Sequence, residues 1–142
     1  MSAQAGKMSV AAHVPISIGE LVDKISILEI KAQRIGDPEK LANIRRELDL
    51  LCAVQRDIGL DNSEMGEFLG ELKAINLALW EIEDEIRELD SKREFGPRFV
   101  GLAQKVYRFN DRRSQIKRLI NQRFGSAIVE EKSYKGAPTR VD

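Results

Sequence analysis

The feature that most constrains the fold is a helical repeat of apolar residues in four successive segments of the chain. These segments cover about 18–34, 38–58, 64–90 and 97–124, and no convincing strand alternation precedes the C-terminal tail. The breaks between them are only a few residues long. Short connectors between long helices favour antiparallel neighbours, so we predict an all-α fold, an up-and-down four-helix bundle.

Residues with strong capping preferences mark the ends of these segments. Ser17 precedes the first helix and Glu20 follows three residues later, which is the pattern of a capping box. Asp37 and Pro38 suit the cap and first turn of the second helix, and Gly125 suits the end of the fourth. The sequence therefore predicts helix limits as well as helix number.

Size and composition predict one domain between two tails. The 142 residues suit a single core, and 42% apolar with 32% charged residues is typical of a soluble, helix-rich protein. We expect a flexible tail over residues 1–14, a helical domain over 15–124 and an extended tail over 125–142. Beyond Gly125, Ile128, Val129 and Tyr134 could dock the extended tail, as a packed tail or as a lid.

No apolar run is long enough to span a bilayer, so we expect no membrane insertion. The first residues contain no continuous apolar block, so no secretory signal is expected either. The single cysteine, Cys52, cannot form an internal disulfide and suits a reducing compartment. We therefore expect a cytoplasmic protein.

Charge is balanced overall but unevenly distributed. Lys plus Arg equals Asp plus Glu at 23 each, so no whole-chain field favours nucleic acid or membrane partners. Residues 64–90 hold nine acidic and two basic side chains, a balance of minus seven, whereas 98–123 hold eight basic and one acidic, plus seven. We expect these two helices to attract each other. A nucleic-acid surface on the basic helix is disfavoured, since no aromatic platform or recognised motif accompanies it.

Polar residues interrupt the apolar stripes of the third and fourth helices at facing positions. Burying such groups costs several kcal/mol unless they are paired or contact a ligand. Folding the hairpin near Phe95 is expected to bring them to one level. The residues are Asn76, Trp80, Glu83 and Arg87 on the third helix, and Tyr107, Asn110, Arg113, Lys117 and Asn121 on the fourth.

The first helix adds a carboxylate to this layer. Glu29 lies in the middle of an apolar stripe, whereas Ile27 and Ile30 point the other way, beside Asp23. A helix with apolar residues on both sides must be covered on both sides. We expect the tail or a second subunit of a homodimer to cover Ile27 and Ile30.

The chemistry of the layer favours a small anionic ligand. Arg87, Arg113 and Lys117 would hold a phosphate or carboxylate, because guanidinium offers a bidentate fork. The amides would orient the ligand and the two aromatic rings would stack on it. Glu29 or Glu83 would act as acid or base if burial raised its pKa. The ligand class we expect is a sugar phosphate or nucleotide-like metabolite, and whether it is transformed is left open.

The same residues also allow a purely structural interpretation. In that case Glu83 pairs with Arg87 one turn on, and Glu29 pairs with Lys117 or Arg113, so that a buried network fixes the helix register. No ligand is then required.

Metal and cofactor chemistry finds little support. His13 is the only histidine, which excludes histidine-based metal sites and Ser/His triads. Glu81 and Asp84, with Glu20 and Asp23 upstream, resemble the paired acidic motifs of helical nucleotide pyrophosphohydrolases, but their separation is much longer. We expect neither a metal nor a cofactor.

Four sequence blocks carry a resemblance. They are SIGELVDKISILEIK at 17–31, LWEIEDEIR at 79–87, VYRFNDRR at 106–113 and VEEKSY at 129–134. Together they resemble an uncharacterised family of small helical bacterial and phage proteins, which implies a helical fold but no activity. The second and third blocks are also similar, in part, to a helical family encoded beside lipopolysaccharide glycosyltransferases, which implies a link to surface-glycan assembly.

An alternative function follows from this resemblance. The chain would be a noncatalytic adaptor that dimerises through Ile27 and Ile30 and partners glycan enzymes or phage machinery. The ligand-binding hypothesis depends on the side of the first helix that carries Glu29, whereas the adaptor hypothesis depends on the side that carries Ile27 and Ile30.

Overall fold

A computed structural model describes residues 9–133 of the protein. Its helices are α2 (Ile18–Arg34), α3 (Pro38–Asp57), α4 (Ser63–Ser91) and α5 (Pro97–Arg123). No strand occurs among the described residues. The predicted all-α, four-helix fold is confirmed, and the helices begin and end close to the expected positions.

Local capping explains these limits. The Ser17 Oγ accepts a hydrogen bond from the Glu20 backbone N–H at 3.0 Å, and the Asp37 carboxylate accepts one from the Lys40 N–H at 3.0 Å. These side chains satisfy donors that the first helical turn leaves unpaired. The Glu20 carboxylate pairs with Lys117 instead of closing the capping box.

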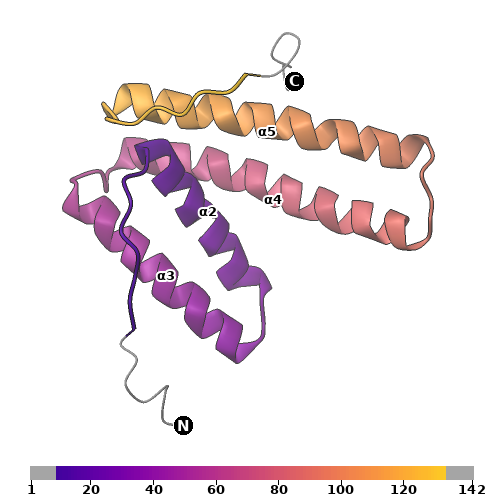
Figure 1. Ribbon diagram of the computed structural model, residues 1–142, viewed down its shortest axis with the longest axis horizontal. Helices are drawn as coiled ribbons and strands as arrows, with labels where there is room; N and C mark the ends of the chain where they lie inside the picture. The colour runs from indigo at the N-terminus through magenta and orange to yellow at the C-terminus, as the bar shows by residue number, and fades with distance from the viewer. Residues whose placement is uncertain (1–8, 134–142) are drawn as a thin grey trace.

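The helices form two antiparallel hairpins of unequal length. Figure 1 shows the α2–α3 hairpin packed across one half of the longer α4–α5 hairpin, whose other half extends beyond it as an arm. Among the described helices, α3 packs on α2 alone, whereas α2 packs on α3, α4 and α5. The first helix is therefore the central one, and α3 is peripheral.

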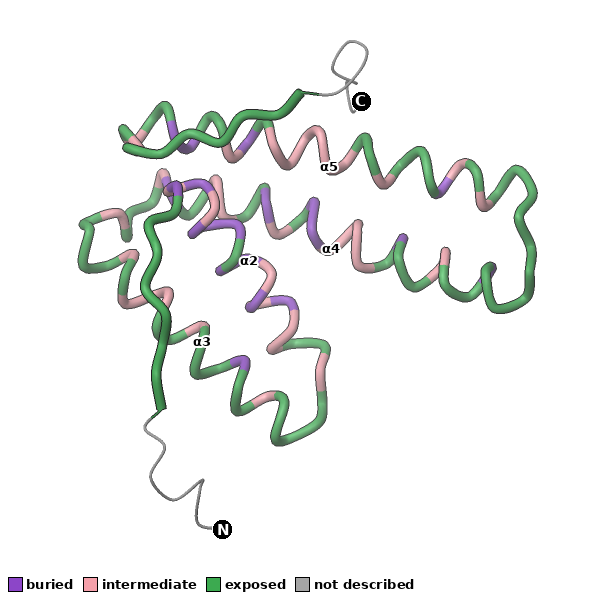
Figure 2. Tube along the Cα trace, in the orientation of Figure 1, coloured by how far each residue is buried: buried purple, intermediate pink, exposed green. Residues whose placement is uncertain are grey.

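The main core lies where α2 meets the α4–α5 hairpin. A smaller core lies between α4 and α5 in the arm. Figure 2 shows buried residues concentrated on α2 and the adjoining faces of α4 and α5, while most of α3 is exposed. The buried residues of the main core are Val22, Met65, Leu72, Ile75, Ile116 and Ile120, and those of the arm are Ile82, Leu89 and Leu102.

The second apolar side of α2 is covered within the chain. Ile30 is 1% exposed and, with Ile27, lines a groove shared with α4. The expectation that the tail or a second subunit covers Ile30 is therefore wrong. The helix carries two apolar sides because it packs against helices on both sides.

The segment after α5 turns back along that helix (Figure 1). The turn uses Gly125, whose φ of 67° is favourable for glycine. Ser126 Oγ then accepts a hydrogen bond from the Ile18 N–H at 3.1 Å. Ile128 and Val129 remain exposed, and Tyr134 lies outside the described residues, as does the 1–8 part of the expected flexible tail.

None of the four helices combines the length and the apolar character that crossing a bilayer requires.

Candidate functional site

A buried carboxylate lies at the junction of α2, α4 and α5. Asp23 on α2 has no exposed surface. Arg113 Nε on α5 lies 2.9 Å from both Asp23 oxygens, and its Nη2 lies 2.5 Å from Oδ2. Asn76 Nδ2 on α4 donates to Asp23 Oδ1 and to the Ser26 Oγ, each at 2.8 Å. One carboxylate therefore joins three helices.

Lys117 extends this network toward the start of α2. Its Nζ lies 2.5 Å from Glu20, 3.8 Å from Asp23 and 3.7 Å from Glu130. Glu130 also accepts a hydrogen bond from the Ser17 hydroxyl at 2.5 Å. The C-terminal segment is thereby tied to α2 and α5 together.

The first turn of α2 lies directly against α5. The Gly19 N–H donates to Asn121 Oδ1 at 2.7 Å. A Cβ at Gly19 would lie 2.5 Å from the backbone oxygen of Lys117 and 3.0 Å from Asn121 Oδ1. Only glycine permits this approach, and the approach brings Asn121 within reach of the helix terminus.

The network is internally satisfied. Every buried side-chain nitrogen and oxygen of the described residues has a hydrogen-bond partner. Hydrogen bonds to Asp23 raise the pKa of Arg113, so this cation stays charged at all ordinary pH values. Replacing such a buried pair by apolar groups is often neutral, whereas removing one partner is strongly destabilising. These contacts support a structural role for Asp23, Asn76 and Lys117.

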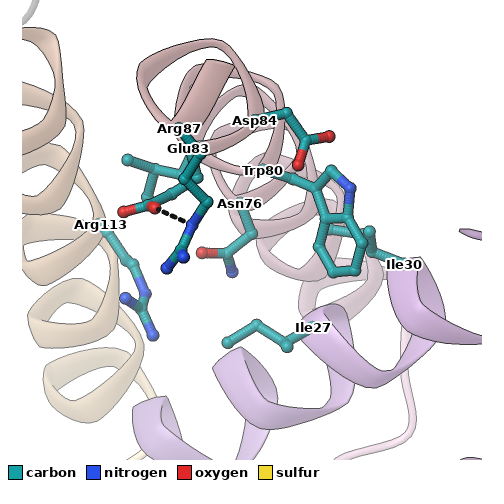
Figure 3. Close-up of a pocket in the computed structure, with 9 residues that line it drawn as sticks. Ile27, Ile30, Asn76, Trp80, Glu83, Asp84, Arg87 and Arg113 are labelled. Carbon is teal, nitrogen blue, oxygen red and sulfur yellow. Dashed lines mark hydrogen bonds and ion pairs between the residues drawn. The ribbon is translucent and has the colours of Figure 1, made fainter. Parts of the chain in front are cut away.

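An open groove of about 390 Å³ adjoins the network. Apolar side chains of α2 and α4 form its floor, and charged side chains stand at its rim (Figure 3). The lining residues are Ile27, Ile30, Asn76, Leu79, Trp80, Glu83, Asp84, Arg87 and Arg113.

The groove has two chemically different sides. In Figure 3 the guanidinium groups of Arg87 and Arg113 lie toward α5, whereas Trp80 and Asp84 lie together on the other side, near Ile30. Arg87 is 80% exposed, and its Nε lies 3.3 Å from Glu83. A cationic side and an aromatic, acidic side thus share one apolar floor.

Arg113 belongs to both the network and the groove. Its Nε and Nη2 donate to Asp23, and its Nη1 donates to Asn110 Oδ1 at 3.4 Å. Guanidinium has five N–H groups, so one on each terminal nitrogen is left for a ligand. The buried carboxylate therefore holds this guanidinium in place at the groove.

Comparison with known proteins identifies the family. Residues 12–140 match a family of unknown function, DUF6165. The chain belongs to the DUF6165 family. No curated protein and no solved structure matches it. Membership brings no assigned activity, so a function for this DUF6165 protein has to be argued from its geometry.

Most of the expected site residues of this DUF6165 protein lie either in the groove or in the buried network. Five of them line the groove, and Asn110 accepts a hydrogen bond from Arg113 Nη1. Lys117 and Asn121 lie in the buried network, nearer the start of α2, so the polar groups follow α2 instead of sharing one level. The five groove residues are Asn76, Trp80, Glu83, Arg87 and Arg113.

Two expected site residues lie elsewhere. Glu29 Oε1 lies 3.9 Å from Lys73 Nζ on α4, so the expected pairing of Glu29 with Lys117 or Arg113 is wrong. Glu29 lies one turn beyond Ser26 on α2, and Lys73 lies one turn before Asn76 on α4. Tyr107 is exposed on α5 and does not line the groove.

Sequence reasoning missed Asp23, the centre of the network. Its position beside Ile27 and Ile30 predicted an outward side, but that side of α2 is buried as well. A usable signal was the polar repeat Ser17, Glu20, Asp23 and Ser26, in which each residue neighbours the next one across a single helical turn.

The opposite net charges of α4 and α5 produce few ion pairs between these two helices. Arg123 Nε lies 2.6 Å from Glu64 Oε1 near one end, and Arg98 pairs with Glu85 near the other. Most remaining charges of α4 and α5 face solvent or pair within one helix. Over residues 9–133, no group of three or more His, Cys, Asp or Glu side chains is arranged to hold a metal ion.

Proposed function

We propose that this DUF6165 protein binds a small anionic sugar phosphate in the groove between α2, α4 and α5. The observation that carries the proposal is the pair of guanidinium groups, Arg87 and Arg113, facing an indole and a carboxylate across an apolar floor. A volume of about 390 Å³ suits a ligand of this size.

The phosphate would lie between the two guanidinium groups. Arg113 is fixed by Asp23 and has unused N–H groups, whereas Arg87 is exposed and held only by Glu83. A fixed cation gives the anion a defined position, and a mobile one can close on it. The arrangement favours a doubly charged phosphate over a single carboxylate.

The sugar would lie on the other side of the groove. The Trp80 ring offers a flat apolar face, and Asp84 next to it can accept hydrogen bonds from hydroxyl groups. Acidic side chains repel a second anionic group but suit a polyol. This chemistry favours a sugar phosphate over a dicarboxylate or a bare anion.

Acid–base chemistry, if the ligand is transformed, falls to Glu83. This carboxylate lines the groove beside Arg87, whereas Glu29 lies outside the groove and pairs with Lys73. Glu83 is half-exposed, and its Oε2 lies 3.3 Å from Arg87 Nε. We therefore propose ligand binding as the main function, with Glu83 as the general base if the ligand is transformed.

The resemblance of two blocks to a family encoded beside lipopolysaccharide glycosyltransferases supports a sugar ligand. On this resemblance we propose that the protein is bacterial or phage-encoded and that its ligand belongs to surface-glycan assembly. The family match itself supplies neither origin nor pathway.

Tryptophan fluorescence tests the proposal, because Trp80 is the only tryptophan and lines the groove. The protein is titrated with a hexose 1-phosphate, inorganic phosphate and the uncharged hexose. We expect a saturable change with the hexose phosphate, a weaker response to phosphate and none to the hexose. Equal responses to all three, or none, would contradict the proposal.

Arg87→Gln provides the matched variant, since Arg87 is exposed and its removal leaves the buried network intact. Loss of a charge-assisted hydrogen bond should raise the Kd about 10- to 100-fold. Lys105→Gln removes an exposed cation of α5 that does not line the groove, and should leave the Kd unchanged.

A further inference from the structure

The helix α3 is the least packed element of the fold. Only Ile44 is buried along its length, and α2 is the one described helix that it contacts. Figure 1 places α3 at the edge of the molecule, away from α4 and α5 for most of its length. A large part of its surface is therefore free to contact another molecule.

A stripe of apolar side chains lies on this free surface. Leu50 is 57% exposed, Val54 is 45% exposed and Ile58, at the end of the helix, is 50% exposed. Residues four apart lie on the same side of a helix, so the three form one stripe about 12 Å long. Exposed apolar residues in such an array mark an interaction surface more often than isolated ones do.

No charged side chain of α3 forms an ion pair within residues 9–133, and Glu47, which is exposed, lies within the stripe one turn before Leu50. Two further charges lie along one edge of the stripe. Arg46 precedes Leu50 by one helical turn, and Asp57 follows Val54 by about one turn. Both are exposed, and neither forms an ion pair within residues 9–133. On a helical projection the two charges lie along the same edge of the stripe.

We propose that α3 pairs with α3 of a second copy of this chain, in antiparallel orientation, to form a homodimer. With the two-fold axis at the level of Cys52, Leu50 lies opposite Val54 of the second copy. Arg46 then lies beside Asp57 of the second copy, and symmetry repeats both contacts. Glu47 lies on the other side of the stripe, near Ile58 of the second copy, and takes no part in this charge pairing.

Apolar contact supplies most of the affinity, and charge sets the direction. Exposed ion pairs contribute little on their own, but a parallel pairing would place Arg46 next to Arg46 and Asp57 next to Asp57. Like charges at facing positions would oppose that arrangement. This interface does not involve the groove, so it is independent of ligand binding.

Sedimentation equilibrium on the full chain tests the proposal. The wild type is expected to dimerise at micromolar concentration, and Leu50→Glu should weaken self-association at least ~100-fold. Leu119→Glu is the matched control, since Leu119 is 48% exposed on α5, away from α3, and should leave the dimer intact. Circular dichroism should remain helical for both variants.

A charge exchange separates this pairing from non-specific association. Arg46→Asp should weaken the dimer, and Arg46→Asp combined with Asp57→Arg should restore it. A monomeric wild type at the highest concentration measured would overturn the proposal. So would dissociation by Leu119→Glu instead of Leu50→Glu, or failure of the exchanged pair to restore the dimer.

Discussion

Arg113 on α5 donates hydrogen bonds to both carboxylate oxygens of Asp23 on α2, and Asp23 is fully buried. The same guanidinium reaches the groove, where two of its N–H groups have no protein partner. The polar residues in the helix stripes thus have two roles. Those around Asp23 hold three helices together, and those near Trp80 are available to a ligand.

Removal of one member of the Asp23–Arg113 pair should be strongly destabilising. Asp23→Ala leaves Arg113 and Lys117 without their shared carboxylate, and should lower the free energy of unfolding by about 3 kcal/mol or more. The double variant Asp23→Leu with Arg113→Met replaces the pair by apolar groups and should be less destabilised than Asp23→Ala. Urea denaturation measures these values. A double variant as destabilised as Asp23→Ala, or more so, would show that the loss does not come from leaving Arg113 without its partner.

Substitution at Gly19 should test how closely α2 approaches α5. A Cβ there would meet the Lys117 backbone oxygen, which cannot move without displacing α5, so Gly19→Ala should be destabilising by about 1–3 kcal/mol. Gly70→Ala is the control. Gly70 lies within α4 with nothing near its missing Cβ, and alanine there should stabilise by about 0.5–1 kcal/mol. Equal effects at both glycines would rule out the close approach.

The C-terminal segment should stabilise the fold through Glu130 and only slightly through Glu131. Glu130 accepts from the buried Ser17 hydroxyl and lies near Lys117, so Glu130→Ala should lower the free energy of unfolding by about 1 kcal/mol. Glu131 forms only an exposed pair with Arg118, and Glu131→Ala should change it little. Thermal and urea unfolding of both variants provide the comparison; a larger loss for Glu131→Ala would contradict it.

Cys52 should react slowly and only at high pH. Burial raises the pKa of its thiol, and the nearby negative charge of Glu29 adds to the shift. The protonated thiol is thus favoured in the folded protein, so its stabilising contribution is complete below the unfolded thiol's pKa of about 8.5 and is lost as the pH rises through the folded value. Alkylation of native protein at pH 8 should be slower than alkylation of urea-unfolded protein. Equal rates would show a freely exposed, unshifted thiol.

The helices could be predicted from sequence because local features determine them. Ser17, Asp37 and the apolar repeats all act within a few residues. The burial of Asp23 could not be predicted in this way, because it depends on which helices cover each side of α2. The apolar period alone does not reveal that α2 is covered on two sides while α3 is covered on one.

The site was partly predictable for the same reason. The stripe of α4 brought Asn76, Trp80, Glu83 and Arg87 together, since residues three or four apart share a helix side. Glu29 was misplaced because the packing of α2 on α4 places it next to Lys73, one turn from the Ser26–Asn76 contact, and not next to Lys117 or Arg113 on α5. Which residues share one side of a helix could be predicted from their spacing in the sequence. Contacts between helices could not, because they depend on how the helices pack.

The claim that the groove is a ligand site is tested most directly by the thermal midpoint of the wild type and of Arg87→Gln, each with and without a hexose 1-phosphate. Arg87 is exposed, so the two proteins should unfold at the same temperature without ligand. Ligand at about 100 times the wild-type Kd should raise the wild-type midpoint by several degrees and that of Arg87→Gln by half as much or less. An unchanged wild-type midpoint, or an equal rise in both proteins, would contradict the account.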